Sequence, residues 1–332
     1  MGDYCNRLHF RHHLGATMTT TGSPTLGWIG TGRMGFELST RLLAAGHDLT
    51  AYNRTRAKAE PLTAKGAKIV DTPRELADRE IVFVMVSAPK DLEQVMYGEN
   101  GLLTNPDHAP KIIVDSSTVS EEVSAKVRAA AAKRGAVFLA APVSGNPAVI
   151  AAGKLTVAVS GPHETFKIVE PLLATFGRSV TWVGEGEVAR LVKIAHNVYL
   201  GIVIQALAEI TVLAERGGVS RAAFLDFLND SVMGSTFSRY KTPALVNLDF
   251  NATFTIPLLS KDFDLGLAAA HDLKVPMPIA SATSQLIASA GGAGYLTEDF
   301  AVLIVEQARR SGYEIKSEQT PVLSGLEVSG NE

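Results

Sequence analysis

The chain has 332 residues, of which 46% are hydrophobic and 20% are charged. At roughly 150 residues per domain this length suggests two domains, and the composition is that of a globular protein and excludes a disordered one. The net charge of −3 excludes a strongly basic nucleic-acid-binding protein and broad electrostatic capture by an anionic membrane. The single cysteine, Cys5, excludes an internal disulfide framework and fits the reducing cytoplasm, where we expect the protein to act.

Residues 1–24 follow neither a helical nor a strand pattern, and we predict that they form a disordered tail. The tail lacks the apolar run of about 7 residues that a signal peptide needs. It holds His9, His12 and His13, but no Cys/His cluster with ligand spacing follows in the folded part, so no metal site is expected. No stretch of the chain reaches the ~18 uninterrupted apolar residues of a membrane span.

From residue 25 to residue 186, short apolar runs alternate with helical patterns, which predicts an α/β domain with a mostly parallel sheet. Strands are predicted at residues 26–29, 48–52, 81–86, 111–114, 136–139, 155–159 and 180–183. Helices are predicted at 34–46, 56–65, 120–133 and 163–176.

After residue 186 the pattern becomes helical, and residues 187–314 are predicted to form an all-α domain for substrate binding and dimerisation. Its helices are expected at 188–216, 221–229, 258–272, 279–290 and 300–310. The first of them is apolar around most of its circumference and needs cover on nearly every side. We therefore expect a homodimer or a tetramer. Residues 315–332 are predicted to be a flexible C-terminal tail.

A glycine-rich loop lies between the first predicted strand and the first predicted helix. Gly30 allows a tight turn, Gly32 lets a pyrophosphate approach the backbone, and Gly35 lets the helix pack close to the strand. The helix start adds free N–H groups and a positive dipole end. The alternative is an ordinary glycine-rich turn, but this context favours a Rossmann domain with a cofactor loop made of Gly30, Thr31, Gly32, Arg33, Met34 and Gly35.

The end of the second predicted strand indicates which dinucleotide is bound. A carboxylate there would bond the ribose hydroxyls of NAD and repel a 2′-phosphate, but the chain has Asn53, Arg54 and Thr55 instead. Arg54 can pair with a phosphate in forked geometry, and the other two can donate hydrogen bonds. This favours NADP(H) as the preferred cofactor, with NAD(H) as the alternative; Arg54 could also be a solvated charge.

Three further segments lie at the carboxyl ends of predicted strands, where a sheet of this kind binds ligands. They are residues 114–118, residues 141–146, which form a turn rich in hydroxyl and backbone donors, and residues 184–186, which lead into the long helix. On that helix Lys193 and Asn197 are four residues apart and share one face.

Read together, these motifs resemble those of the β-hydroxyacid dehydrogenase family, which includes 3-hydroxyisobutyrate dehydrogenases and glyoxylate/succinic semialdehyde reductases. The resemblance extends over residues 25–312. It implies that Lys193 is the catalytic residue and that Asn197 orients the substrate, while Ser144 and Gly145 hold a substrate carboxylate. It also implies cofactor contacts from Val86, Ser87, Thr118 and Lys261.

Two residues depart from the family pattern. Asn146 stands where the family usually has a glycine, and His196 stands where it usually has an asparagine. Both are predicted, with Ser117, to bind the substrate, although His196 could be an ordinary histidine of a helix interface.

The implied activity is NADP(H)-dependent hydride transfer to and from a small-molecule substrate, a short β-hydroxyacid or semialdehyde, with Lys193 as general acid and base. Glyoxylate, succinic semialdehyde, methylmalonate semialdehyde and tartronate semialdehyde all fit. One alternative is an imine reductase or reductive aminase, which generally carries another residue where this chain has Lys193. The other is a non-catalytic NADP-binding protein.

Overall fold

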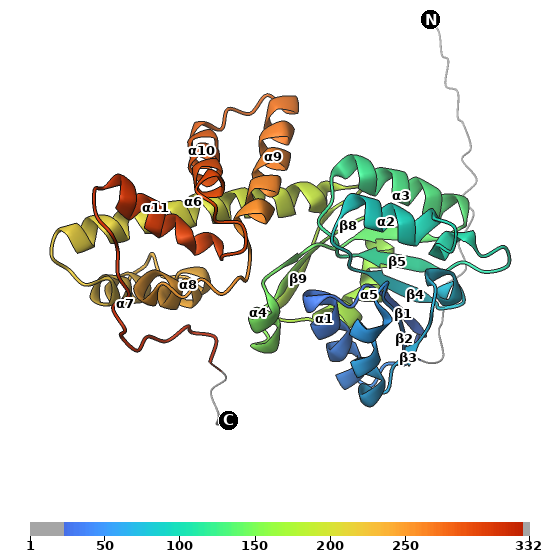
Figure 1. Cartoon of the computed structure of the whole chain (residues 1–332). Coiled ribbons are helices and arrows are strands. Elements are labelled where there is room, and N and C mark those ends of the chain that lie inside the picture. Colours follow the sequence, from blue (N-terminus) through green and yellow to red (C-terminus); the bar gives the residue numbers. More distant parts are fainter. Residues whose placement is uncertain (1–22, 328–332) are drawn as a thin grey trace, which may run out of the picture.

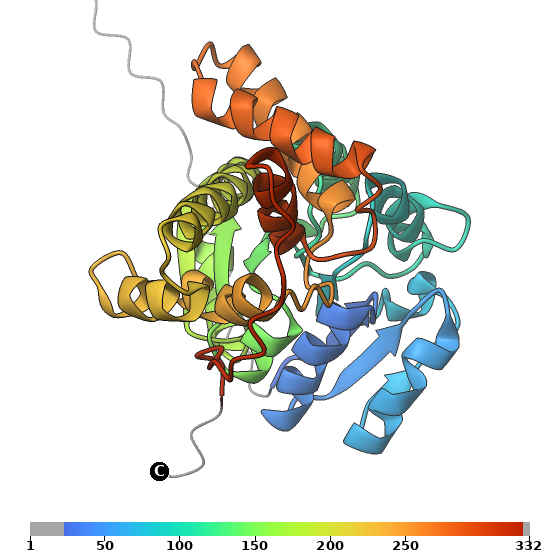
Figure 2. The ribbon, with the colours of Figure 1, turned by 60° about the vertical axis from the view of Figure 1, so that its left-hand side comes forward.

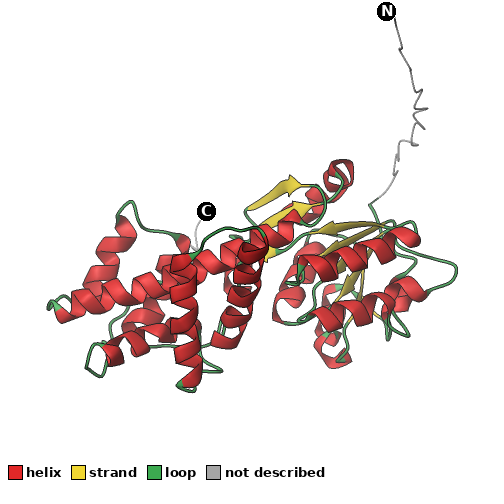
Figure 3. Cartoon of the chain, turned by 90° about the horizontal axis from the view of Figure 1, so that it is seen from above, coloured by secondary structure: helices red, strands yellow, loops and turns green. Residues whose placement is uncertain are grey.

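The structure is a computed structural model that describes residues 23–327. All but the last two residues of the predicted N-terminal tail therefore lie outside the described residues. Figure 1 shows two parts, an α/β part and a helical part, connected by the long helix α6 (Val188–Arg216). Figure 3 shows that the strands belong to one part, while the other is built from helices and loops.

The α/β part is built on a nine-stranded sheet in the order β3-β2-β1-β4-β5-β6-β8-β7, with β9 paired to β8. The pairs from β3 to β6 are all parallel, which confirms the predicted mostly parallel Rossmann-type sheet. The strands are β1 (Leu26–Ile29), β2 (Leu49–Tyr52), β3 (Lys68–Ile69), β4 (Ile81–Val84), β5 (Ile112–Asp115), β6 (Val137–Ala140), β7 (Val143–Ser144), β8 (Thr156–Ser160) and β9 (Ser179–Gly184).

Helices cover both faces of this sheet, and its central strands are apolar except for Asp115 at the end of β5. Leu26 and Trp28 pack in one core with α1 (Arg33–Ala44) and α5 (His163–Ala174). Ile29 and Val82 pack in another with α2 (Pro89–Tyr97) and α3 (Glu121–Lys133). Because side chains alternate along a strand, neighbouring residues supply opposite cores. The carboxyl ends of the strands are thereby fixed in one row.

The α/β part differs from the prediction in its small elements. The helix expected at residues 56–65 is two 3₁₀ turns, Arg56–Lys58 and Glu60–Lys65, because Pro61 has no N–H to continue one α-helix. β3, β7, α2 and α4 (Pro147–Ala151) were not predicted. Most of them have two to five residues, which is too short for a periodic pattern.

The helical part surrounds α6, which has 29 residues and is about 44 Å long. It packs against α9 (Ile256–Asp272), α10 (Pro278–Gly292) and α11 (Leu303–Arg310). α7 (Arg221–Asp230) and α8 (Thr236–Asn247) complete the domain. A Cβ on Gly201 would lie 2.3 Å from the Phe263 ring, so this glycine lets α6 and α9 approach closely.

By length and composition, α6 could cross a membrane, and it is the one helix of residues 23–327 with that property. Its buried side chains, such as Ile204 and Ala208, belong to the core of the helical domain, which is the position of a core helix. Val192, Tyr199 and Leu213 remain 41%, 67% and 72% exposed. A second subunit that covers this face stays a prediction.

Between α11 and residue 327 the chain lacks regular secondary structure but is held at several points, unlike the loose tail expected from the sequence. The Glu318 carboxylate accepts hydrogen bonds from the backbone N–H groups of Arg221 (2.6 Å) and Ala222 (3.0 Å). Thr320 exchanges two hydrogen bonds with Asn247 at the end of α8. Figure 2 shows the segment leaving α11 and descending past α8.

Candidate active site

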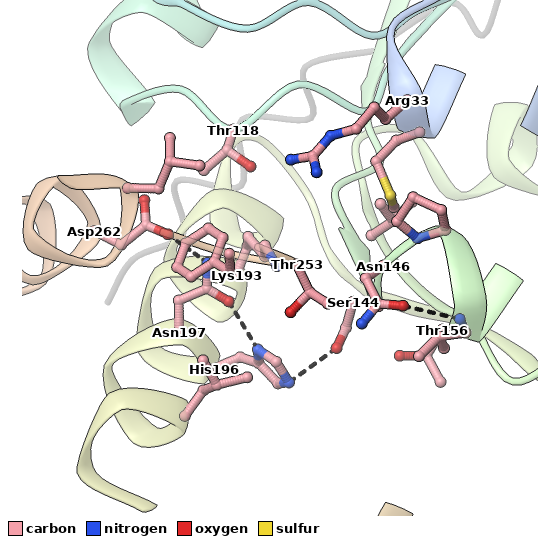
Figure 4. A pocket seen from close by; sticks show the side chains of 18 of the residues that line it. Arg33, Thr118, Ser144, Asn146, Thr156, Lys193, His196, Asn197, Thr253 and Asp262 are labelled. Atoms are coloured by element: carbon pink, nitrogen blue, oxygen red, sulfur yellow. Dashed lines mark hydrogen bonds between the residues drawn. The ribbon is translucent and has the colours of Figure 1, made fainter. Parts of the chain in front are cut away.

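A cleft of about 570 Å³ lies where the carboxyl ends of the strands meet the helical domain. It is bordered by the glycine-rich loop, by the turns after β4, β5 and β6, by the first half of α6, and by α8 and α9. Figure 4 shows that side chains from these elements surround one space. The predicted site residues that line it are Gly32, Arg33, Met34, Gly35, Val86, Ser87, Ser117, Thr118, Ser144, Gly145, Asn146, Lys193, His196, Asn197 and Lys261.

The glycine-rich loop has the geometry of a phosphate cradle. Gly30 has a φ of +95°, and a Cβ there would lie 2.1 Å from the Met85 carbonyl oxygen. A Cβ on Gly35 would lie 2.0 Å from the Gly30 carbonyl oxygen, whereas a Cβ on Gly32 would enter open space. Among the described residues, no side chain caps the start of α1 at Gly32. The first N–H groups of α1 are therefore available to an anion that approaches the bare backbone at Gly32.

The remaining predicted cofactor residues, Asn53, Arg54 and Thr55, follow the end of β2, beside the glycine-rich loop. The Thr31 N–H donates to the Asn53 side-chain oxygen (2.9 Å), and the Asn53 amide donates to the Thr55 carbonyl (2.9 Å). Asn53 thus fastens the loop to the end of β2. Arg54 is 81% exposed and pairs with Asp91 at 2.7 Å.

Lys58 is a cation at this end that the sequence reasoning missed. It lines a second, smaller cavity together with Thr31 and Arg33. The sequence feature that could have revealed Lys58 is its position four residues after Arg54, on the turn that follows β2. Lys58 thus adds a positive charge beside the Thr31 and Arg33 part of the loop, in a cavity that Glu37 also lines.

Lys193 lines the main cleft from the first half of α6. Within residues 23–327, its Nζ has no hydrogen-bond partner and no carboxylate within ion-pair distance. Burial lowers the pKa of Lys193 from 10.5 to about 8; the nearby Lys261 lowers it further, and Asp262 opposes both. An amine with this pKa exists in both protonation states near neutral pH, which suits a general acid and base.

Four side chains form a hydrogen-bonded chain across the cleft, drawn as dashed lines in Figure 4. The Ser144 Oγ lies 2.9 Å from His196 Nε2, and His196 Nδ1 lies 3.0 Å from Asn197 Oδ1. The Asn197 amide nitrogen donates to Asp262 at 2.5 Å. Both polar ends of Asn197 are engaged with protein groups. These contacts favour a role for Asn197 in positioning His196 over the predicted role of orienting the substrate itself.

Ser117 and Asn146, both predicted to bind substrate, instead accept hydrogen bonds from backbone N–H groups of the protein. Ser117 is 1% exposed and its hydroxyl accepts the Val86 N–H at 2.9 Å, which ties two cofactor turns together. The Asn146 side-chain oxygen accepts the Val149 N–H at 3.0 Å and caps α4. They shape the walls of the cleft.

Arg190 is a buried residue whose role the sequence reasoning missed. It is 1% exposed, and its guanidinium lies 2.5 Å from the Asp115 carboxylate and 2.5 Å from the Ser117 carbonyl oxygen. It also donates to the Ser124 hydroxyl at 3.1 Å. The start of α6, three residues before Lys193, is thereby fastened to the end of β5. The sequence feature that could have revealed this role is an arginine inside an apolar helix, because a buried arginine needs a partner.

The helical domain supplies further cleft residues that the sequence reasoning did not single out. Asp262 is 1% exposed, and Phe237, Tyr240 and Phe254 line the cleft from α8 and from the segment before α9. Burial raises the pKa of Tyr240, with Asp299 adding to the effect. Tyr240 is therefore a neutral hydrogen-bonding group at neutral pH. Within residues 23–327, no group of three or more His, Cys, Asp or Glu side chains could hold a metal ion.

Two family models match consecutive parts of the chain. Residues 25–184 match the NAD binding domain of 6-phosphogluconate dehydrogenase. Residues 184–305 match the model described as NAD-binding of NADP-dependent 3-hydroxyisobutyrate dehydrogenase.

Individual proteins match over most of their length. An uncharacterized oxidoreductase of Bacillus subtilis is 34% identical over 83% of this chain and 97% of its own. The glyoxylate/succinic semialdehyde reductase 2 of Arabidopsis thaliana is 28% identical over 87% of this chain and 81% of its own. Among solved structures, the 3-hydroxyisobutyrate dehydrogenase from Salmonella typhimurium is 26% identical with a TM-score of 0.76, covering 85% of this chain and 99% of that one. An imine reductase from Myxococcus stipitatus, 24% identical over 84% and 98% of the two chains, has a TM-score of 0.56 and shares the fold.

Proposed function

The chain belongs to the β-hydroxyacid dehydrogenase family and is an oxidoreductase that acts on hydroxyl groups with a nicotinamide cofactor; on this premise, we propose that it interconverts short β-hydroxyacids and their carbonyl acids, preferring NADP(H), with Lys193 as general acid and base. The observation that carries this proposal is Lys193 itself. Its Nζ, which has no partner in the described part of the chain, lines the same cleft as the phosphate cradle and the Ser144 turn.

The residues present fit a dinucleotide cofactor, because a Cβ would clash at Gly30 and Gly35 and no side chain of residues 23–327 caps the start of α1. When bound, the cofactor supplies or accepts the hydride. The loop and α1 would hold its pyrophosphate, and Arg54 and Lys58 would hold its 2′-phosphate. In the reductive direction, the Lys193 ammonium stabilises the developing alkoxide and gives it a proton. In the oxidative direction, the neutral amine takes the proton back.

The substrate class follows from the charge of the cleft. Besides Lys193, the cations Arg33, Lys154, Arg178 and Lys261 line it, against the carboxylate of Asp262. This balance favours an anionic substrate. The relatives named after 3-hydroxyisobutyrate, glyoxylate and succinic semialdehyde support a carbonyl acid. Ser144 and Gly145, on the turn after β6, are proposed to take its carboxylate.

A panel of carbonyl compounds tests this proposal. Glyoxylate, succinic semialdehyde, methylmalonate semialdehyde and tartronate semialdehyde are assayed beside cyclic imines, with NADPH and NADH in parallel. We expect the highest kcat/KM for a carbonyl acid with NADPH. Turnover confined to the imines would instead support the imine reductase alternative. NADPH binding without any turnover would support a non-catalytic protein.

Substitution of Arg54 tests the cofactor preference. A hydrogen bond to a charged group contributes about 1.5–3 kcal/mol, so Arg54→Gln is expected to raise the KM for NADPH by about 10–100-fold and to leave that for NADH nearly unchanged. The matched control is Arg56→Gln, because Arg56 is a nearby exposed arginine that already pairs with Glu60 and Asp71. An unchanged ratio of kcat/KM for the two cofactors in Arg54→Gln would refute the role of Arg54.

A further inference from the structure

His196 links the turn that faces the substrate with a buried carboxylate. Its ring nitrogens lie 2.9 Å from the Ser144 hydroxyl and 3.0 Å from the Asn197 amide oxygen, and Asn197 reaches Asp262 at 2.5 Å. Figure 4 draws the three contacts as successive dashed lines from Asp262 through Asn197 and His196 to Ser144. Such a chain has a direction, because each link needs one donor and one acceptor.

The buried end of the chain sets this direction. The Asp262 carboxylate accepts hydrogen bonds only, so Asn197 must turn its NH₂ group toward it. The amide oxygen of Asn197 then faces His196 and can accept but not donate. Consequently Nδ1 of His196 must carry a hydrogen.

The tautomer of His196 in turn sets the direction of the Ser144 hydroxyl. A neutral imidazole has one N–H, and here Nδ1 holds it, so Nε2 is an acceptor. The Ser144 hydroxyl must therefore donate to Nε2, which leaves its lone pairs toward the cleft. A substrate carboxylate offers only acceptors and so cannot bond to Ser144 in this state.

We propose that His196 is a positioning residue that sets the direction of the Ser144 hydroxyl, and that binding of a substrate carboxylate at Ser144 adds one proton to His196. In the imidazolium, Nε2–H donates to the Ser144 oxygen, and the serine O–H turns to the carboxylate. Nδ1–H stays on Asn197. The proton comes from solvent and returns to it when the acid leaves. The carboxylate step rests on the proposed function; the direction of the chain does not.

The charges around His196 fit a group that is neutral until an anion arrives. On α6 the nearest is Lys193; α9 presents Asp262 and Lys261, and α8 presents the neutral Tyr240. Lys154 and Arg178 line the same cleft from the strand side, and Arg33 from α1. Burial, then Lys193, lowers the pKa of His196, and the bond to Asn197 opposes this. A bound carboxylate would add a negative charge beside the ring and favour the imidazolium.

Nuclear magnetic resonance of protein labelled with ¹⁵N-histidine tests the direction of the chain without any need for activity. The His196 signals are those missing from the His196→Asn variant. We expect neutral His196 to carry its hydrogen on Nδ1, the tautomer that Asn197 dictates, in the full-length free protein at neutral pH. A hydrogen on Nε2 would overturn the proposal.

Calorimetry tests the uptake of the proton. 3-Hydroxyisobutyrate is titrated into the NADPH complex, a pair that cannot react, in buffers of different ionisation enthalpy from pH 6 to pH 9. In the wild type, the Kd of 3-hydroxyisobutyrate is expected to rise above the His196 pKa, toward about tenfold per pH unit. In His196→Asn, which keeps the titration of Lys193, the Kd should rise more weakly. His163→Asn, a change on α5 outside the cleft, is the control and should match the wild type.

The outcomes separate this inference from the proposed function. Equal proton uptake in wild type and His196→Asn would refute the coupling. Failure of every acid in the panel to bind would refute the carboxylate step together with the proposed function, while the tautomer result would stand.

Discussion

Replacement of Lys193 by methionine is expected to lower kcat for carbonyl reduction by about 10²–10⁴-fold, the usual contribution of a positioned general acid. Methionine keeps the length and the apolar stem of the side chain but cannot carry a proton. The fold should survive, because the change removes an amine whose charged form burial already disfavours. The thermal unfolding midpoint is therefore expected to stay the same or to rise.

The control for this change is Lys126→Met. Lys126 lies on α3, outside the cleft, in an exposed pair with Glu122, so its loss should leave kcat unchanged. NADPH binding, measured by fluorescence titration, should stay near the wild-type value in both variants. If Lys193→Met kept kcat within a few-fold of the wild type, another group would have to supply the proton.

Replacement of Arg190 by methionine should produce the largest loss of stability. The change leaves the Asp115 carboxylate, which is 0% exposed, without its cation. Removal of one partner of a buried ion pair costs about 3–5 kcal/mol. The midpoint of urea-induced unfolding should fall accordingly, and kcat should fall with it, because Arg190 fastens the part of α6 that carries Lys193.

A double variant separates the lost charge pair from a general packing defect. Arg190→Met combined with Asp115→Leu removes both buried charges, and such replacements are often neutral. We expect it to regain most of the stability that the single change loses. A double variant no more stable than Arg190→Met would show that the other hydrogen bonds of the two residues, from Arg190 to Ser117 and Ser124 and from the Ser117 N–H to Asp115, matter more than the pair.

Local patterns in the sequence were sufficient for the fold class and for the phosphate loop. Gly30, Gly32 and Gly35 lie within six residues of one another, and their effect depends only on the strand before and the helix after them. The long α6 and the alternation of strands and helices are likewise visible as periodicity. α8 was missed because Pro243 lies inside it and its hydrophobic pattern is weak.

The contacts that complete the site join residues far apart in the chain, and no local pattern contains them. Asn197 meets Asp262, 65 residues later, and Arg190 meets Asp115, 75 residues earlier. The sequence placed Asn197 on the correct helix face but could not show that Asp262 engages its amide. His196 stood out as a departure from a family pattern, yet its link to Ser144 required the packing of α6 against the turn after β6.

The pH dependence of kcat in both directions tests the central role of Lys193 most directly. Reduction needs the ammonium, which predominates below the lowered pKa of about 8, so kcat for reduction should fall above that pH toward tenfold per unit. Oxidation needs the neutral amine, so its kcat should fall below the same pH. Both effects should be absent from Lys193→Met. Profiles that bend in the same direction for the two reactions, or that persist in Lys193→Met, would contradict the assignment of Lys193 as the acid and base.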